Sequence, residues 1–344
     1  MRYKLSSLFL PIALGFSKEN AEQTSSKKLT TSSIDQNISS PLKKKAQILS
    51  LIQEKEVFRA MSFNVLWQNE STDSLCPCSW NQRKEQVASM IRFHKADIIG
   101  LQEPLDTQIQ DLIDLLPDYD FYGIGWEDGQ SKGPIDAILW KKSRFTRKEE
   151  GYFFLSPTPD TPSKGWNAKF PRGVTWVKVK DKKTGKYCYI FNTHFDYHSE
   201  EARHESASLL RMQIEKIAKG ECFVVTGDFN LFPEMGAEET YGILTSSEHP
   251  GSSLIDAKNK ALFPHHGPTG TWSGFKEAGQ PGVKPDFIFV SERIGVMIHG
   301  VLSDCFDGLF PSDHLPVVAD LFIMGKNHKN LQYASEKERS LAKC

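Results

Sequence analysis

The sequence lacks the short motifs that mark several large enzyme classes. It has no Walker-type glycine-rich loop and no GxGxxG fingerprint after its first predicted strand. GQSKG (129–133) matches the pattern GxSxG, but it lies in a glycine-rich turn between two predicted strands and not in the strand–turn–helix setting of a nucleophile elbow. The sequence has no internal repeat either, which argues against a solenoid or a propeller. These absences argue against P-loop NTPases, α/β-type serine hydrolases and dinucleotide-dependent oxidoreductases.

Cysteine is scarce, and its spacing specifies no metal knuckle or disulfide framework. Six cysteines are spread over 344 residues. Cys76 and Cys78 are too close together for an easy mutual disulfide, and they lack zinc-knuckle spacing. Cys188 and Cys222 fall in apolar, strand-like runs, where we expect buried thiols.

A strong charge excess is also missing. The formal net charge is -1, but residues 57–325 carry 28 Lys and Arg against 36 Asp and Glu. An acidic body attracts the phosphate backbone of long nucleic acid only weakly, so we expect no strong grip on a duplex. With 39% hydrophobic and 25% charged residues, the composition is that of a globular protein, which we expect to be a monomer.

The first residues resemble a secretory signal peptide. Arg2 and Lys4 precede an apolar stretch at 5–16 that is too short for a comfortable membrane span. We therefore expect a signal peptide over 1–21, with a poorly ordered leader as the alternative. The signal would make the protein extracytoplasmic or secreted, and without it the protein would be cytoplasmic.

Composition divides the remaining chain into three parts. Residues 22–56 are rich in Ser, Thr, Lys, Asn and Gln, which predicts a flexible linker. Residues 57–325 alternate apolar runs with helical patterns, which predicts an α/β catalytic domain. Residues 326–344 form a charged C-terminal tail.

Polar side chains fall at the ends of the predicted buried strands. Each one alone has a structural explanation, such as an Asx-type turn at Asp228 and Asn230. A buried carboxylate nevertheless needs a partner. Together the set supplies oxygen ligands suited to Mg²⁺ or Mn²⁺, and two imidazoles. Its members are Asn64, Glu103, Asn192, His194, Asp196, Asp228, Asn230, Asp286, Asp313 and His314.

Six segments, in this order, resemble the endonuclease/exonuclease/phosphatase superfamily. They are SFNV (62–65), IIGLQEP (98–104), NTHFD (192–196), TGDFN (226–230), PDFIFV (285–290) and SDH (312–314). Four more segments resemble a bacterial branch of metal-dependent hydrolases: WNQRK (80–84), FFLSPTPDTPSKGW (153–166), PRGVTWVKV (171–179) and TWSGF (271–275). The resemblance implies a four-layer α/β sandwich, with two mixed β-sheets face to face and helices outside.

The resemblance also implies a divalent-metal site. By that resemblance Glu103 is the principal ligand of Mg²⁺ or Mn²⁺, with Asn64 and Asp313 nearby. Whether one ion or two bind is left open by the sequence.

Catalytic roles are implied in the same way. Asp228 would orient or deprotonate the attacking water, and Asn230 would hold the phosphate or the water. His194 would form hydrogen bonds with the phosphoryl oxygens. His314, held by Asp286, would stabilise the transition state or transfer a proton.

Four residues are expected to bind substrate: Arg172, Trp126, Trp272 and Asp196. The chain departs from the bacterial branch at 125–129, at Pro134 and at Tyr197. We expect these positions at the mouth of the pocket, where they affect substrate preference more than chemistry.

The expected activity is hydrolysis of a phosphodiester or phosphomonoester by a water that a metal and an Asp activate. One alternative is a nuclease acting on RNA or single-stranded DNA, and another is a catalytically silent secreted binding module. The expected partner is a phosphate-containing substrate, which would be a small molecule, a lipid head group or single-stranded nucleic acid.

Overall fold

A computed structural model describes residues 56–69, 78–247, 253–276, 279 and 281–325. All described elements fall in one compact unit. The predicted signal peptide, nearly all of the predicted linker, the C-terminal tail, Cys76 and Cys344 lie outside the described residues. Among the residues described, no helix is long and apolar enough to cross a membrane.

The first of two mixed β-sheets has the strand order β11-β12-β1-β2-β4-β3. β1 is parallel to β2 and antiparallel to β12. β11 is an edge strand. The strands are β1 Phe58–Asn64, β2 Ile98–Gln102, β3 Tyr119–Tyr122, β4 Ala137–Lys141, β11 Ile294–Val301 and β12 Val317–Ile323.

The second sheet has the order β5-β6-β7-β8-β10-β9. β6 and β7 form an antiparallel hairpin around the Thr184-Gly185-Lys186 turn. β7 and β8 are parallel, so their carboxyl ends meet at one edge of the sheet. The strands are β5 Phe145–Phe154, β6 Gly173–Asp181, β7 Tyr187–His194, β8 Phe223–Asp228, β9 Ile255–Asp256 and β10 Asp286–Val290.

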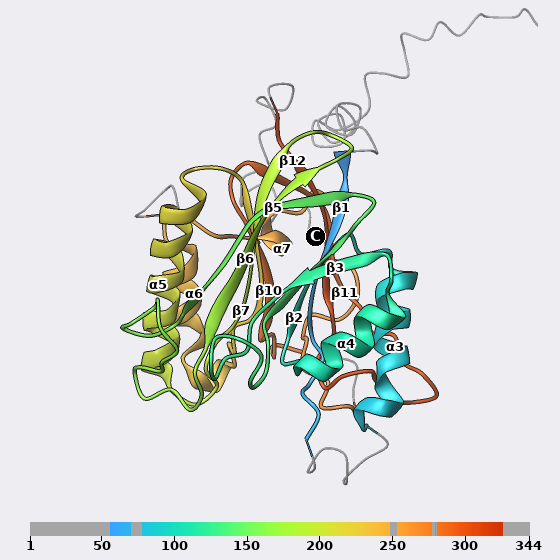
Figure 1. The fold of residues 1–344 in the computed structure, drawn as a ribbon, viewed down its shortest axis with the longest axis horizontal. Helices are drawn as coiled ribbons and strands as arrows, with labels where there is room; N and C mark the ends of the chain where they lie inside the picture. Colours follow the sequence, from blue (N-terminus) through green and yellow to red (C-terminus); the bar gives the residue numbers. More distant parts are fainter. Residues whose placement is uncertain (1–55, 70–77, 248–252, 277–278, 280, 326–344) are drawn as a thin grey trace, which may run out of the picture. The chain divides into compact units, whose positions relative to one another are not determined.

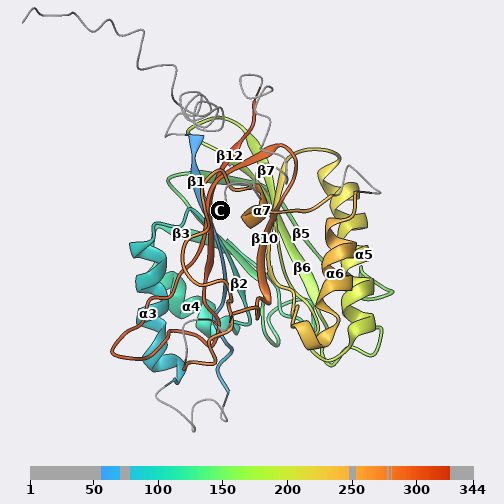
Figure 2. The same cartoon turned by 180° about the vertical axis from the view of Figure 1, so that it is seen from behind.

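Helices cover the outer faces of both sheets, which gives four layers (Figures 1 and 2). α3 and α4 pack on the first sheet, and α5 and α6 pack on the second. A 3₁₀ turn, Pro233–Met235, precedes α6, and the short α7 contacts β10 and β11. The helices are α3 Trp80–Phe93, α4 Asp106–Leu115, α5 Glu200–Ala218, α6 Ala237–Thr245 and α7 Ala257–Lys260.

Local sequence explains these helices and their packing. Ser199 caps α5 because its hydroxyl accepts a hydrogen bond from the Ala202 amide at 3.1 Å. Three apolar clusters fill the spaces between the four layers. The central cluster, which includes Ile98, Ile190 and Val317, lies between the two sheets. The predicted four-layer sandwich is therefore confirmed.

A buried polar network also joins the two sheets. The side-chain amide of Asn192 in β7 donates to the carbonyls of Leu101 and Ala137 in the first sheet, at 2.8 and 3.0 Å. Its oxygen accepts from Gln102 at 2.6 Å. Gly100 is needed beside this network, because a Cβ atom there would lie 2.4 Å from the Asn192 oxygen. Asn192 therefore holds the sheets together.

Candidate active site

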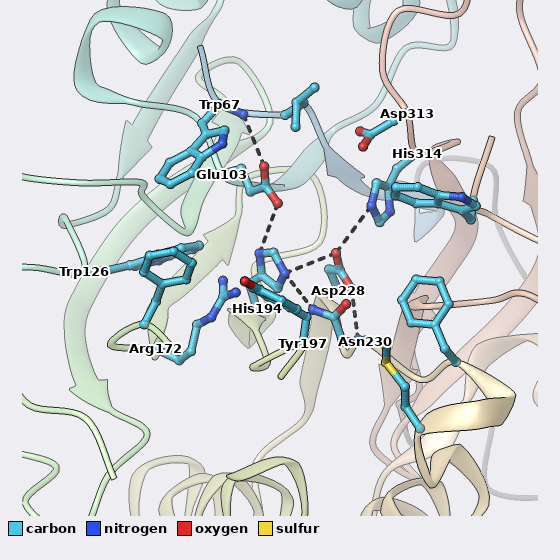
Figure 3. Close-up of a pocket in the computed structure, with 15 residues that line it drawn as sticks. Trp67, Glu103, Trp126, Arg172, His194, Tyr197, Asp228, Asn230, Asp313 and His314 are labelled. Carbon is cyan, nitrogen blue, oxygen red and sulfur yellow. Dashed lines mark hydrogen bonds and ion pairs between the residues drawn. The ribbon is translucent and has the colours of Figure 1, made fainter. Parts of the chain in front are cut away.

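One pocket opens at the edge where strands of both sheets end. Its volume is about 420 Å³, within the range of small-molecule sites. Figure 3 shows its side chains converging from both sheets. The lining residues are Leu66, Trp67, Glu103, Trp126, Phe170, Arg172, His194, Tyr197, Asp228, Asn230, Phe232, Met235, Trp272, Asp313 and His314.

Strand register places the central polar groups in a row across the second sheet. His194 ends β7, Asp228 ends β8, and the two are paired in the parallel register. Asp286 opens β10 and pairs with Asp228 from the other side. The first sheet contributes Asn64, the last residue of β1, and Glu103, which directly follows β2.

Asp228 lies at the centre of the site and is almost fully buried. Its Oδ2 accepts a hydrogen bond from the Asn64 amide at 2.9 Å, and its Oδ1 accepts from the Asn230 backbone amide at 2.9 Å. Burial raises the pKa of Asp228, and the nearby His314 opposes that shift only in part. This buried carboxylate is therefore more basic than an exposed one.

His314 is held by a carboxylate from the other sheet. Its Nδ1 lies 2.8 Å from Asp286 Oδ2, which also accepts a 2.6 Å hydrogen bond from the Thr271 hydroxyl. Burial lowers the pKa of His314, but the charges of Asp286 and Asp228 outweigh burial and raise it well above its usual value. His314 is therefore an imidazolium near neutral pH, and its Nε2 lies 3.7 Å from Asp228.

His194 is the opposite case, since burial lowers its pKa well below the usual value and keeps it neutral. The Asn230 side-chain amide donates to the Phe195 carbonyl at 2.9 Å and lies 2.9 Å from His194 Nε2. That Nε2 therefore accepts, and the ring proton sits on Nδ1. Nδ1 has no hydrogen-bond partner within the protein, and Glu103 Oε1 lies 3.8 Å away.

Three pocket residues have left-handed backbone conformations. The φ angles are 56° at Leu66, 74° at Glu103 and 50° at Asn230. Asn tolerates this region, but for Glu or Leu it costs about 1 kcal/mol or more. Such strain is typical of functional sites, and here it falls within two residues of the ends of β1, β2 and β8.

Glu103, Asp313 and Asn64 fit a divalent cation. Figure 3 shows Glu103 and Asp313 facing the same space. Burial raises the pKa of Asp313, and the charge of Glu103 raises it further. A cation between the two carboxylates would remove that repulsion. Asn64 lies 3.0 Å from Glu103 Oε1 and brings an amide to the same place.

A second group could also bind a metal. One atom each from Asp228, Asp286 and His314 lies within 4.8 Å of the others. We favour the Glu103 set because the hydrogen bond between His314 and Asp286 already engages the ring nitrogen, and because His314 carries a positive charge.

Arg172 and Trp126 form one wall of the pocket. The guanidinium carbon of Arg172 lies 4.2 Å from the centroid of the Trp126 ring. The Trp126 indole donates to the buried carboxyl of Asp136 at 3.0 Å. Burial raises the pKa of Asp136 well above its usual value, although the charge of Arg172 opposes the shift. Trp126 also packs edge-on against His194, with ring centroids 5.5 Å apart.

Five aromatic side chains line the rest of the pocket. Trp272 packs edge-on against His314, with ring centroids 5.0 Å apart, and so it also fixes the plane of the imidazole. Tyr197, predicted at the pocket mouth, lines the pocket and is 41% exposed. We call Trp67, Phe170, Tyr197, Phe232 and Trp272 the aromatic wall.

Two predicted polar residues serve the scaffold instead of lining the pocket. Asp196, expected to bind substrate, accepts hydrogen bonds from the backbone amides of Lys169, Phe170, His198 and Ser199. Asn192, grouped with the site from its alternation with His194, bridges the sheets. Alternation identifies one face of a strand but not which of its residues reach the pocket.

Sequence reasoning missed Asp136 and Thr271. Asp136 precedes β4, where its only signal is an acid at the start of an apolar run. Thr271 lies in the segment TWSGF, and its hydroxyl also lies 3.3 Å from the Asp286 backbone amide. Neither pattern distinguishes a site residue from a turn residue.

Comparison with known proteins agrees with this architecture. The model of the "Endonuclease/Exonuclease/phosphatase family" matches residues 61–314. The sandwich and the strand-end site thus define the class, and the chain belongs to the endonuclease/exonuclease/phosphatase family. Members of this family are hydrolases of phosphoester bonds and generally depend on divalent metal ions.

Two solved structures from Bacteroides thetaiotaomicron are similar over most of the chain. One is an endonuclease/exonuclease/phosphatase family protein, 34% identical, with a TM-score of 0.72; the match covers 78% of this chain and 98% of that one. The other is a mannosyl-6-phosphatase, also 34% identical, with a TM-score of 0.72; that match covers 77% and 100%.

A curated relative is the uncharacterized protein L388 of Acanthamoeba polyphaga mimivirus. It is 28% identical over 159 residues, which is 44% of this chain. The match spans 59% of the length of L388.

Proposed function

We propose that the protein is a Mg²⁺- or Mn²⁺-dependent hydrolase of phosphoesters. The observation that carries this proposal is the row of His194, Asp228 and Asp286 at one sheet edge, opposite Asn64 and Glu103 from the other sheet. Together with His314 beside it, this row combines a basic buried carboxylate, Asp228, with a neutral and a charged imidazole. Phosphoryl transfer needs such a set to align water and stabilise developing charge.

Asp228 accepts the proton of the attacking water. Its raised pKa makes it a better base near neutral pH. The water oxygen bonds to phosphorus, the ester P–O bond breaks, and the leaving oxygen takes its electron pair and a proton from solvent. Asn64 and Asn230 hold Asp228 in position through their 2.9 Å hydrogen bonds.

The two histidines act on the phosphoryl oxygens in different ways. His194 donates from Nδ1, because Asn230 engages its Nε2. His314, kept charged by Asp286 and Asp228, stabilises the negative charge that grows in the transition state. Their different charge states follow from the partners that each ring meets.

Glu103, Asp313 and Asn64 would hold the metal. The bound ion supplies Lewis-acid stabilisation of phosphoryl charge. Hard carboxylate and amide oxygens suit Mg²⁺ or Mn²⁺ better than zinc.

A small substrate is favoured over long nucleic acid. Residues 57–325 carry more acidic than basic residues, and the pocket has the volume of a small-molecule site. The similar mannosyl-6-phosphatase supports a phosphorylated small molecule. The aromatic wall offers flat apolar surface to the leaving group, as a sugar ring or a base would need.

The test measures product release from a panel of phosphoesters with Mn²⁺ or Mg²⁺. The panel contains p-nitrophenyl phosphate, sugar phosphates, inositol phosphates, sphingomyelin, RNA and single-stranded DNA. Asp228→Asn should abolish turnover of every hydrolysed substrate without lowering the thermal midpoint by more than a few degrees. The matched control Asp118→Asn changes an exposed carboxylate in the loop between α4 and β3, outside the pocket, and should leave turnover intact. Metal binding without turnover of any phosphoester would support the silent binding module instead.

A further inference from the structure

Arg172 is a buried cation, and two of its three guanidinium nitrogens have no hydrogen-bond partner within the protein. Its side chain is 4% exposed, and its Nε and Nη1 atoms have no hydrogen-bond partner within the protein. Burying such a group without a partner is costly, and buried guanidinium groups are normally paired. An anion that enters the pocket would satisfy these donors.

The neighbouring carboxylates do not satisfy Arg172. Asp196 Oδ2 lies 3.9 Å from Nε, which is too far for a hydrogen bond. Its oxygens already accept from four backbone amides. Asp136 accepts from the Trp126 indole, and burial raises its pKa well above its usual value. Neither acid therefore supplies a hydrogen-bond partner to Nε or Nη1 of Arg172.

The position of Arg172 is fixed toward the reacting centre. Its guanidinium packs over the Trp126 ring at 4.2 Å. Figure 3 shows it pointing toward His194, on the side of the pocket away from His314. Its charge is one of the causes that lower the pKa of His194. A phosphoryl group whose oxygen accepts a hydrogen bond from His194 Nδ1 would thus lie within reach of Arg172.

We propose that Arg172 binds a non-bridging oxygen of a terminal phosphate and makes this pocket selective for phosphomonoesters over phosphodiesters. The proposal rests on the proposed function. A monoester dianion presents one more charged oxygen than a diester, whose second ester group would occupy that place. The planar guanidinium can donate two parallel hydrogen bonds to one phosphate. Hydrolysis then yields an alcohol and inorganic phosphate.

Because two nitrogens of Arg172 have no hydrogen-bond partner, we can predict how its replacement changes the stability of the protein. Replacing buried ionic groups with well-packed apolar side chains of similar volume is often neutral or stabilising. Arg172→Met should therefore keep or raise the thermal midpoint of the protein without phosphate. Loss of activity without loss of stability would separate substrate binding from a scaffold role.

The kinetic test compares p-nitrophenyl phosphate with methyl p-nitrophenyl phosphate, which share one leaving group. In Arg172→Met we expect kcat/KM to fall about 10- to 100-fold for the monoester, the range for a lost charged hydrogen bond, and only a few-fold for the diester. Arg172→Lys should recover part of the loss, because it restores charge but not the fork. Arg92→Met, an exposed site on α3, is the control for losing a positive charge. Equal losses for both esters would overturn the proposal.

A second measurement requires no turnover. Inorganic phosphate should raise the thermal midpoint of the wild-type protein with Mg²⁺ present, and this rise should be lost in Arg172→Met. An unchanged rise in the variant would overturn the proposal. Should the wild type hydrolyse neither ester, the proposed function fails on the activity measurement. The phosphate-dependent midpoint then still decides whether Arg172 binds the anion.

Discussion

The Nδ1 atom of His314 lies 2.8 Å from Oδ2 of Asp286, and this hydrogen bond joins the second sheet to a loop of the first. Asp286 opens β10, and His314 lies in the segment that leads into β12. The hydrogen bond between Asn64 and Asp228 crosses the same boundary. The candidate site therefore depends on the registration of one sheet against the other.

Asp286→Asn should lower kcat at least 100-fold. The carboxylate holds the imidazole of His314 by its Nδ1 proton, and an amide can neither match its charge nor guarantee the same tautomer. Steady-state kinetics on a hydrolysed phosphoester, with KM recorded separately, measure this. The control is Asp304→Asn, which changes the partner of His94, a histidine outside the pocket. A normal kcat in Asp286→Asn would show that His314 does not act through Asp286.

Asn192→Ala should weaken the fold more than the chemistry. It removes two donors to the first sheet and leaves Gln102 without its 2.6 Å acceptor. We expect the free energy of unfolding to fall by roughly 2–4 kcal/mol. Urea denaturation measures that loss, and kcat well below the thermal midpoint should stay within a few-fold. A large loss of kcat at unchanged stability would return Asn192 to the catalytic set.

His299 makes the fold sensitive to acid. It is fully buried in β11, its Nδ1 lies 2.9 Å from His265 Nδ1, and burial lowers its pKa to about 2. Because an unfolded histidine has a pKa near 6.5, the unfolded state binds more protons below that pH. The contribution of neutral His299 is complete above about pH 6.5 and falls by roughly 1.4 kcal/mol per pH unit below it.

The variant His299→Asn removes this titration. Its amide nitrogen can still donate to His265, so the hydrogen bond is retained while the ionisable ring is lost. Urea unfolding at pH 7.0, 6.0 and 5.0 should show a shallower loss of stability in the variant than in the wild type. Parallel pH profiles for the two proteins would contradict the assignment.

Much of the fold could be predicted from local patterns. Apolar runs bounded by polar residues located β1, β2, β7, β8 and β10. β5 was missed because FTRKEEGYFF (145–154) has charged residues at its centre. Such a strand forms by pairing along β6, and short-range periodicity does not show that pairing.

Sequence patterns could not predict the side-chain contacts between the two sheets. Alternate polar positions in β7 and the loop after it have three different outcomes: Asn192 bridges the sheets, His194 reaches the pocket and Asp196 organises a loop. Asp136 looked like any acid beside a strand, yet it anchors Trp126. These roles depend on how segments distant in the sequence pack together, and the local sequence around each residue does not show that packing.

The most direct test of the central claim is the metal dependence of turnover in the wild-type protein. Hydrolysis of p-nitrophenyl phosphate, or of the best substrate from the panel, is followed in excess chelator and again after addition of Mg²⁺ or Mn²⁺. The account predicts that turnover disappears with chelator and returns with either ion, and that the returning ion also raises the thermal midpoint. Full turnover in excess chelator would contradict it.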